Sequence, residues 1–112
     1  MPGSTVIELA SFTATPLARK VIIEWTTESE TDATGFNLYR AESADGDYKK
    51  INSVLIPARG SSTQGAAYEF IDKKVMNRKT FYYKLEDVDL SGKVTMHGPV
   101  NATLRLINMF NK

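Results

Sequence analysis

The sequence predicts an all-β fold, an antiparallel sandwich of about seven short strands. Segments of alternating apolar and polar residues recur along the chain, turn signals separate them, and no segment keeps a helical period over a helix length. Seven short strands in about 100 residues are typical of an immunoglobulin-like sandwich, and a small barrel is the alternative. The 112 residues fit a single domain.

The two central strands are expected at residues 20–27 and 36–42. In both segments large apolar side chains occupy every second position, which is the pattern of a strand with one buried face. Trp25 is the only tryptophan and falls where a large ring would fill the centre of a small core. Gly35 precedes the second strand and is expected to supply either a positive φ or a tight entry.

The remaining strands are expected at residues 6–15, 48–52, 68–71, 80–88 and 94–104. Pro16 is expected to end the first of them, because proline has no N–H for the ladder. Hairpin turns are expected at residues 43–47, which contain an Asp-Gly pair, and at 89–93. Gly98-Pro99 must bend the last strand, and the Gly- and Ser-rich stretch 54–67 is expected to be a surface loop.

Parity along these strands predicts the core and leaves the ends of the chain outside it. Residues 1–5 are interpreted as the linker start of a piece cut from a longer chain, residues 6–103 as the domain, and residues 104–112 as an apolar tail. Three alternatives are open for this tail: it extends the last strand, forms one helical turn, or begins a connection to a following domain. Its residues Leu106, Ile107 and Phe110 are expected to pack on the sandwich or on a second copy of the chain. The predicted core consists of Val21, Ile23, Trp25, Phe36, Leu38, Tyr68, Phe70, Phe81, Tyr83 and Leu85.

Several of these segments resemble a fibronectin type III domain, in particular the modules found in large bacterial secreted and surface proteins. The resemblance covers residues 6–103 and implies a non-catalytic module, either a spacer, an adhesion surface or an accessory domain, in an extracellular or cell-surface protein. It implies no particular ligand. The segments that carry it are Val21-x-Ile23-x-Trp25, Trp25-Thr26-Thr27-Glu28-Ser29-Glu30, Gly35-Phe36-x-Leu38-Tyr39-Arg40, Tyr68-x-Phe70-x-Asp72, Thr80-Phe81-Tyr82-Tyr83-x-Leu85 and the hairpin Asp89–Gly92.

One position departs from that family. Such domains carry a tyrosine early in the sixth strand, and its hydroxyl bonds the backbone of the preceding loop. Counting inward positions back from Leu85 places Phe81 there. The hydrogen bond is therefore either missing or made by Tyr82 or Tyr83 through a bulge.

Composition excludes several function classes. A net charge of +1 argues against nucleic-acid or acidic-membrane binding, and the basic turn at residues 73–79 is interpreted as a solubilising feature. No segment approaches the length of a membrane span, and no signal peptide opens the chain. The absence of cysteine excludes disulfides, zinc-thiolate sites and cysteine nucleophiles. No cofactor is expected, and the expected partners are neighbouring domains of a parent chain, with a protein or polysaccharide as further possibilities.

Neither catalysis nor metal binding is predicted. His97, the only histidine, has no partner in the sequence for a nucleophile–base set, and residues 60–65 lack the Gly-x-Ser-x-Gly spacing. The acidic residues at 28, 30 and 32 and at 86, 87 and 89 do not match a calcium-binding loop. Glu30 is instead expected to brace its connection, held by Arg40 or by loop N–H groups.

The surface with the best prospect of binding is aromatic. If Phe36 and Phe81 point inward, Tyr39 and Tyr82 point outward, and parity puts His97 outward if Met96 is inward. These three residues, Tyr39, Tyr82 and His97, would then share one exposed face, where tyrosines serve binding well. The alternatives are ordinary cross-strand pairing on a solvated sheet and a face that grips a polysaccharide.

Overall fold

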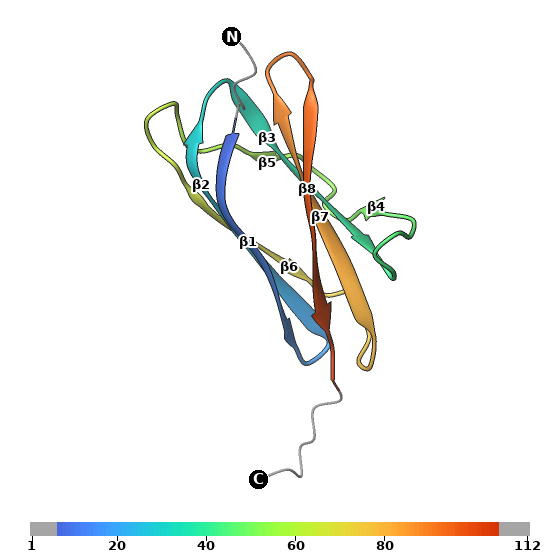
Figure 1. Cartoon of the computed structure of the whole chain (residues 1–112). Helices are drawn as coiled ribbons and strands as arrows, with labels where there is room; N and C mark the ends of the chain where they lie inside the picture. The colour runs from blue at the N-terminus through green and yellow to red at the C-terminus, as the bar shows by residue number, and fades with distance from the viewer. Residues whose placement is uncertain (1–6, 106–112) are drawn as a thin grey trace.

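Two antiparallel sheets packed face to face form the protein (Figure 1), as expected for an all-β sandwich. The computed structural model describes residues 7–105, which contain eight strands rather than seven. The first sheet has the order β1-β2-β6 and the second β4-β3-β7-β8, with β5 also paired to β3. The strands are β1 (Ile7–Leu17), β2 (Lys20–Glu30), β3 (Ala33–Ala41), β4 (Lys49–Lys50), β5 (Ile56–Pro57), β6 (Ala67–Asp72), β7 (Thr80–Asp89) and β8 (Val94–Thr103).

Two differences from the predicted strands have simple causes. The added strand, β5, lies in the segment predicted to be an irregular loop, and Ile56 pairs with Phe36 of β3. The expectation that Pro16 ends the first strand is wrong, because β1 continues to Leu17 and Pro16 pairs with Val21. β1 is at the edge of its sheet, where a missing N–H interrupts no second ladder. Within residues 7–105 there is no helix with the length and hydropathy of a membrane span.

The core is centred on three aromatic rings. Trp25 stacks on Tyr68 with ring centroids 5.2 Å apart, and Phe36 meets both rings edge-on. Every predicted core residue is buried except Phe70, which is half-buried against the cluster. The core cluster also contains four residues that were not predicted, namely Ile7, Val75, Ala102 and Leu104. Because these rings come from both sheets, they hold the sandwich together.

Leu104, the first residue of the predicted tail, belongs to this core. Its side chain is fully buried, its N–H donates to the carbonyl of Lys79, and its carbonyl accepts from Arg78. These contacts attach the end of the last strand to the turn before β7. The predicted packing of Leu106, Ile107 and Phe110 concerns residues outside the described part of the chain.

The entry to β3 uses close packing at Gly35. The left-handed conformation falls on Asp32, with φ of 52°, and not on Gly35. A Cβ on Gly35 would lie 2.3 Å from the carbonyl oxygen of Ile56. Of the two roles expected for Gly35, the tight entry is therefore the one found, because β5 packs directly against its backbone.

Candidate functional site

Three buried carboxylates are the chemically most notable groups of the sandwich. Glu30, Asp72 and Asp87 are each less than 5% exposed, and a buried ionised group must be paired or hydrogen-bonded. Perturbed buried acids gather at catalytic sites, so their partners decide whether they act chemically or hold the fold. Each is therefore described with the donors that reach it.

Glu30, at the end of β2, ties three segments together. Its carboxylate accepts hydrogen bonds from the Thr27 hydroxyl at 2.5 Å, the Gly60 N–H at 2.6 Å and the Tyr68 hydroxyl at 2.7 Å. The prediction that loop N–H groups hold Glu30 is confirmed by Gly60. The alternative partner, Arg40, is wrong, because its guanidinium bonds Asp72. Glu30 thus fastens the loop after β5 to the first sheet.

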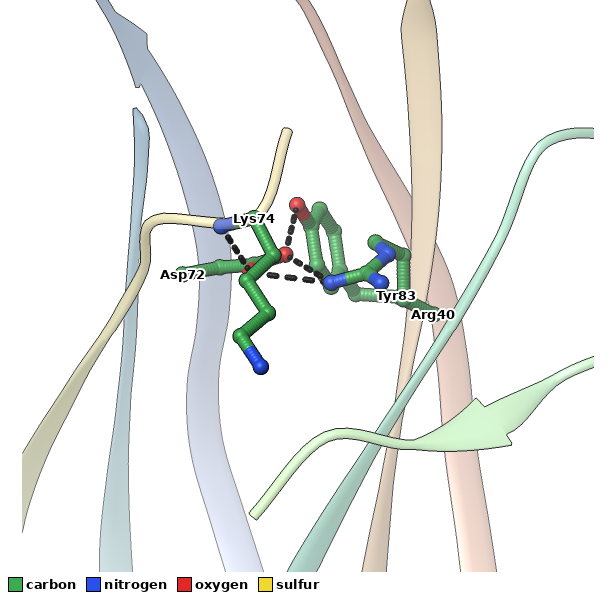
Figure 2. Close-up of polar contacts among 4 residues, drawn as sticks. All are labelled: Arg40, Asp72, Lys74 and Tyr83. Atoms are coloured by element: carbon green, nitrogen blue, oxygen red, sulfur yellow. Dashed lines mark hydrogen bonds and ion pairs between the residues drawn. The ribbon is translucent and has the colours of Figure 1, made fainter. Parts of the chain in front are cut away.

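Asp72, at the end of β6, performs the same task at the other end of the sandwich. Figure 2 shows its carboxylate facing both the Tyr83 hydroxyl and the Arg40 guanidinium. Arg40 donates at 2.8 and 2.9 Å, the Tyr83 hydroxyl at 2.9 Å and the Lys74 N–H at 3.1 Å. The Tyr83 hydroxyl therefore donates to a side-chain carboxylate and not to the loop backbone that the resemblance implied, and the Asp72 carboxylate in turn accepts from the Lys74 N–H.

Asp87 accepts from the histidine that was expected on the outer face. His97 Nε2 lies 2.5 Å from Asp87 Oδ2, and the register pairs His97 with inward-facing Leu85. Met96 pairs with Glu86 and is 44% exposed, so the assumption that Met96 points inward is wrong. His97 consequently faces away from Tyr39 and Tyr82.

The acidic loop residues do not converge on a common point. Glu30 and Asp87 turn inward, whereas the Asp89 carboxylate accepts from the Ser91 hydroxyl and from the N–H groups of Ser91 and Lys93. The hydrogen bond from Ser91 is the main cause that lowers the pKa of Asp89. Across residues 7–105 no group of three or more metal-ligating side chains is positioned to hold an ion.

The two predicted tyrosines do share the outer face of the second sheet. The register pairs Tyr39 with Lys84 and Ala41 with Tyr82, which makes the two tyrosines diagonal neighbours. A third ring, Tyr48, was missed by the sequence reasoning, and the Lys84 ammonium lies 4.5 Å from its centroid. We call Tyr39, Tyr48 and Tyr82 the outer tyrosine face. The Asp-Gly turn that precedes Tyr48 was the signal that could have placed it there.

Polar contacts fix part of this face. The Tyr39 hydroxyl donates to the Glu86 carboxylate at 3.3 Å, and the Asn37 amide donates to the same carboxylate at 2.8 Å. Burial, followed by the Glu86 charge, raises the pKa of Tyr39. All three tyrosines are half-buried, so the face exposes only part of each side chain.

The tyrosines bound to the buried carboxylates predict a loss of stability at alkaline pH. Burial is the main cause that raises the pKa of Tyr68 to about 12, and burial followed by the Asp72 charge raises the pKa of Tyr83. A tyrosine that holds its proton more tightly when folded stabilises fully below the unfolded pKa of about 10. That stabilisation is lost as the pH rises through the folded pKa.

We therefore expect the free energy of unfolding to fall by about 2–3 kcal/mol between about pH 10 and 12 from Tyr68 alone. Urea titrations at stepped pH would measure this decline. The Tyr68→Phe variant should be less stable at neutral pH and should show a shallower alkaline decline. An unchanged slope in Tyr68→Phe would contradict the assignment.

Known proteins resemble this chain in sequence in one case and in fold in several others. No family model matches the sequence. Over 89 residues the chain is 28% identical to an amylopullulanase from Thermoanaerobacter thermohydrosulfuricus, a match that covers 79% of this chain and 5% of that protein. The chain thus spans a small part of the length of that relative.

Several solved structures have a similar fold but share less sequence identity with this chain. A β-1,2-glucanase from Parabacteroides distasonis superposes with a TM-score of 0.66 and 19% identity, over 96% of this chain and 14% of that one. An Fn3-like protein from Clostridium thermocellum superposes with a TM-score of 0.61 and 15% identity, over 93% and 99% of the two chains. OgpA from Akkermansia muciniphila superposes with a TM-score of 0.59 and 14% identity, over 95% and 29%.

Proposed function

We propose that this chain is a non-catalytic fibronectin type III-like module of a larger extracellular or cell-surface bacterial protein. In that protein it serves as a spacer or protein-interaction domain. The observation that carries the proposal is the way its buried acids are used. Glu30, Asp72 and Asp87 each accept from side chains or N–H groups of other segments, which leaves them occupied by structural contacts.

The comparisons support the module role. An amylopullulanase and a β-1,2-glucanase each contain a stretch similar to this chain that is a small share of their length. In the Fn3-like protein of similar fold, the part that matches this chain is almost the whole protein. A unit of this kind, with its own core, folds as a domain and adds length or a surface to the protein that carries it.

The proposal is tested by incubating the purified chain with pullulan, starch and β-1,2-glucan and measuring reducing ends. We expect no release above that of a heat-denatured sample. We also expect a single cooperative thermal transition, because one core spans both sheets. Release of reducing ends that is lost in the Glu30→Gln or Asp72→Asn variant, with the fold intact, would contradict the proposal.

A second candidate function is polysaccharide binding through the outer tyrosine face. The observation in its favour is the grouping of three rings around Lys84. Tyrosine offers an apolar ring and a hydroxyl for hydrogen bonding, a combination suited to sugars. Native gels containing pullulan or β-1,2-glucan should retard the chain, and Tyr39→Ala with Tyr82→Ala should abolish the retardation. Equal mobility with and without glycan would count against this function.

A further inference from the structure

An open cleft runs along one edge of the sandwich, between β4 of one sheet and β6 of the other. Its volume is about 430 Å³. Its apolar wall is formed by Ile51, Phe70 and Ile71. Both sheets contribute to it, so a ligand in the cleft would touch β4 and β6 together.

The remaining lining is strongly cationic. Five basic side chains and one carboxylate line the cleft, namely Arg40, Lys49, Lys50, Lys73, Lys74 and Asp72. Asp72 is already matched by Arg40. Lys49 pairs with Asp47, but both side chains are more than three-quarters exposed. Because the whole chain has a net charge of only +1, positive charge is concentrated here.

Three of these lysines line the cleft without a counter-ion. Within residues 7–105, Lys50, Lys73 and Lys74 have no carboxylate in ion-pair contact. Figure 2 shows the Lys74 side chain extending away from the Asp72 carboxylate, and of Lys74 only the backbone N–H donates to that carboxylate. The cleft is therefore suited to a ligand that carries several negative charges.

The cleft also contains an open backbone edge. β6 pairs with β2 and, within the described residues, with no other strand. The Thr27 N–H donates to the Ala66 carbonyl, so alternate residues from Ala66 onward direct their backbone groups at β2. The N–H and C=O of Glu69 and Ile71 consequently point out of the sheet edge, where a further strand would pair.

We propose that this cleft binds an extended acidic polypeptide segment, which adds as a strand to the edge of β6. Glutamates or aspartates of the segment meet Lys50, Lys73 and Lys74, and its alternate apolar side chains rest on Phe70 and Ile51. The open edge favours a peptide over an acidic polysaccharide, since only a peptide backbone supplies matching N–H and C=O groups. The proposal rests on the interaction role proposed above and names its surface and partner class.

The probe is a blocked peptide of alternating glutamate and valine, titrated into the isotope-labelled chain and followed by amide NMR shifts. We expect saturable shifts at Glu69 and Ile71, with slowed hydrogen exchange of both amides. A matched peptide with N-methylated valines keeps the charge but loses donors from its backbone, and should bind about tenfold more weakly. Polygalacturonate serves as the acidic polysaccharide.

Two triple variants separate the cleft from general charge. Lys50→Glu, Lys73→Glu and Lys74→Glu together should weaken peptide binding at least about tenfold. Lys20→Glu, Lys93→Glu and Arg105→Glu change the net charge equally outside the cleft and should alter binding less than about threefold. Thermal transitions of both triple variants confirm that they fold.

Several results would overturn the proposal. Equal weakening in the two triple variants would indicate non-specific charge attraction. Binding of polygalacturonate without binding of the peptide would assign the cleft to an acidic glycan. If the peptide changes amide chemical shifts elsewhere but not at Glu69 and Ile71, strand addition is excluded. A folded chain that releases no sugar and binds no peptide would refute this inference alone, whereas sugar release would refute the module proposal.

Discussion

Replacing Glu30 by alanine is expected to lower the free energy of unfolding by about 3–4 kcal/mol. The substitution leaves the Thr27 hydroxyl, the Gly60 N–H and the Tyr68 hydroxyl without their shared acceptor in a buried site. It also leaves space where the side chain was. Urea unfolding followed by the fluorescence of Trp25, which is the only tryptophan, measures the change.

The same strand supplies a matched control for this prediction. Glu28 has the same side chain two residues earlier but is exposed, so Glu28→Ala should change stability by less than about 0.5 kcal/mol. Glu30→Gln keeps one carbonyl acceptor and should fall between the two variants. Equal stabilities of the Glu28→Ala and Glu30→Ala variants would show that Glu30 braces nothing.

Replacing Asp72 by alanine is expected to cost about 3 kcal/mol. The Tyr83 hydroxyl loses its acceptor, and Arg40 loses its counter-ion. Arg40 is 23% exposed, so water reaches its guanidinium and keeps the loss below that of a fully buried pair. At this chain length, the expected fall in melting temperature is at least about 10 °C.

One further variant separates the parts of this loss, and a second serves as an exposed control. Tyr83→Phe removes one hydrogen bond and keeps the ion pair, so about 1–2 kcal/mol is expected. Asp47→Ala removes an ion pair whose carboxylate is 86% exposed and should change stability by less than about 1 kcal/mol. If Asp72→Ala melted at the same temperature as Asp47→Ala, the bracing role of Asp72 would be refuted.

Period-2 alternation was sufficient to predict the all-β fold and most of the core. Trp25 and Leu38 alternate with polar or half-buried neighbours along their strands, so their inward direction follows from the strand geometry. The strand ends were less predictable. β1 passes through Pro16 because the strand lies at a sheet edge, and position in a sheet is a tertiary property.

His97 shows where this reasoning fails. Tyr83 pairs with Val100 and Leu85 with His97, so two residues of β8, Gly98 and Pro99, stand opposite one residue of β7. Such a bulge disturbs the alternation on which parity depends. Met96, an apolar residue at the start of the same strand, was therefore a misleading reference, because it lies on the exposed face.

The partners of the buried carboxylates depend on contacts far apart in sequence. Glu30 bonds Gly60 across 30 residues, and Asp72 bonds Arg40 across 32. No local pattern selects Arg40 as the partner of Asp72, because the two residues lie on different sheets and meet only when the sheets pack. The cationic cleft was missed for the same reason, because Lys49 and Lys50 meet Lys73 and Lys74 only after the two sheets pack.

The central claim is that Glu30 and Asp72 fasten separate segments of the sandwich together. Amide hydrogen exchange at Gly60 tests it most directly, because this N–H lies in a loop and donates to Glu30 at 2.6 Å. The Gly92 N–H, which bonds Asp89 within an exposed turn, serves as the comparison. We predict that the opening free energy of the Gly60 amide lies within about 1 kcal/mol of that of the amides in the β2–β6 ladder. The Gly92 amide is expected to exchange far faster than the Gly60 amide. Equally fast exchange at Gly60 and Gly92 would contradict the claim.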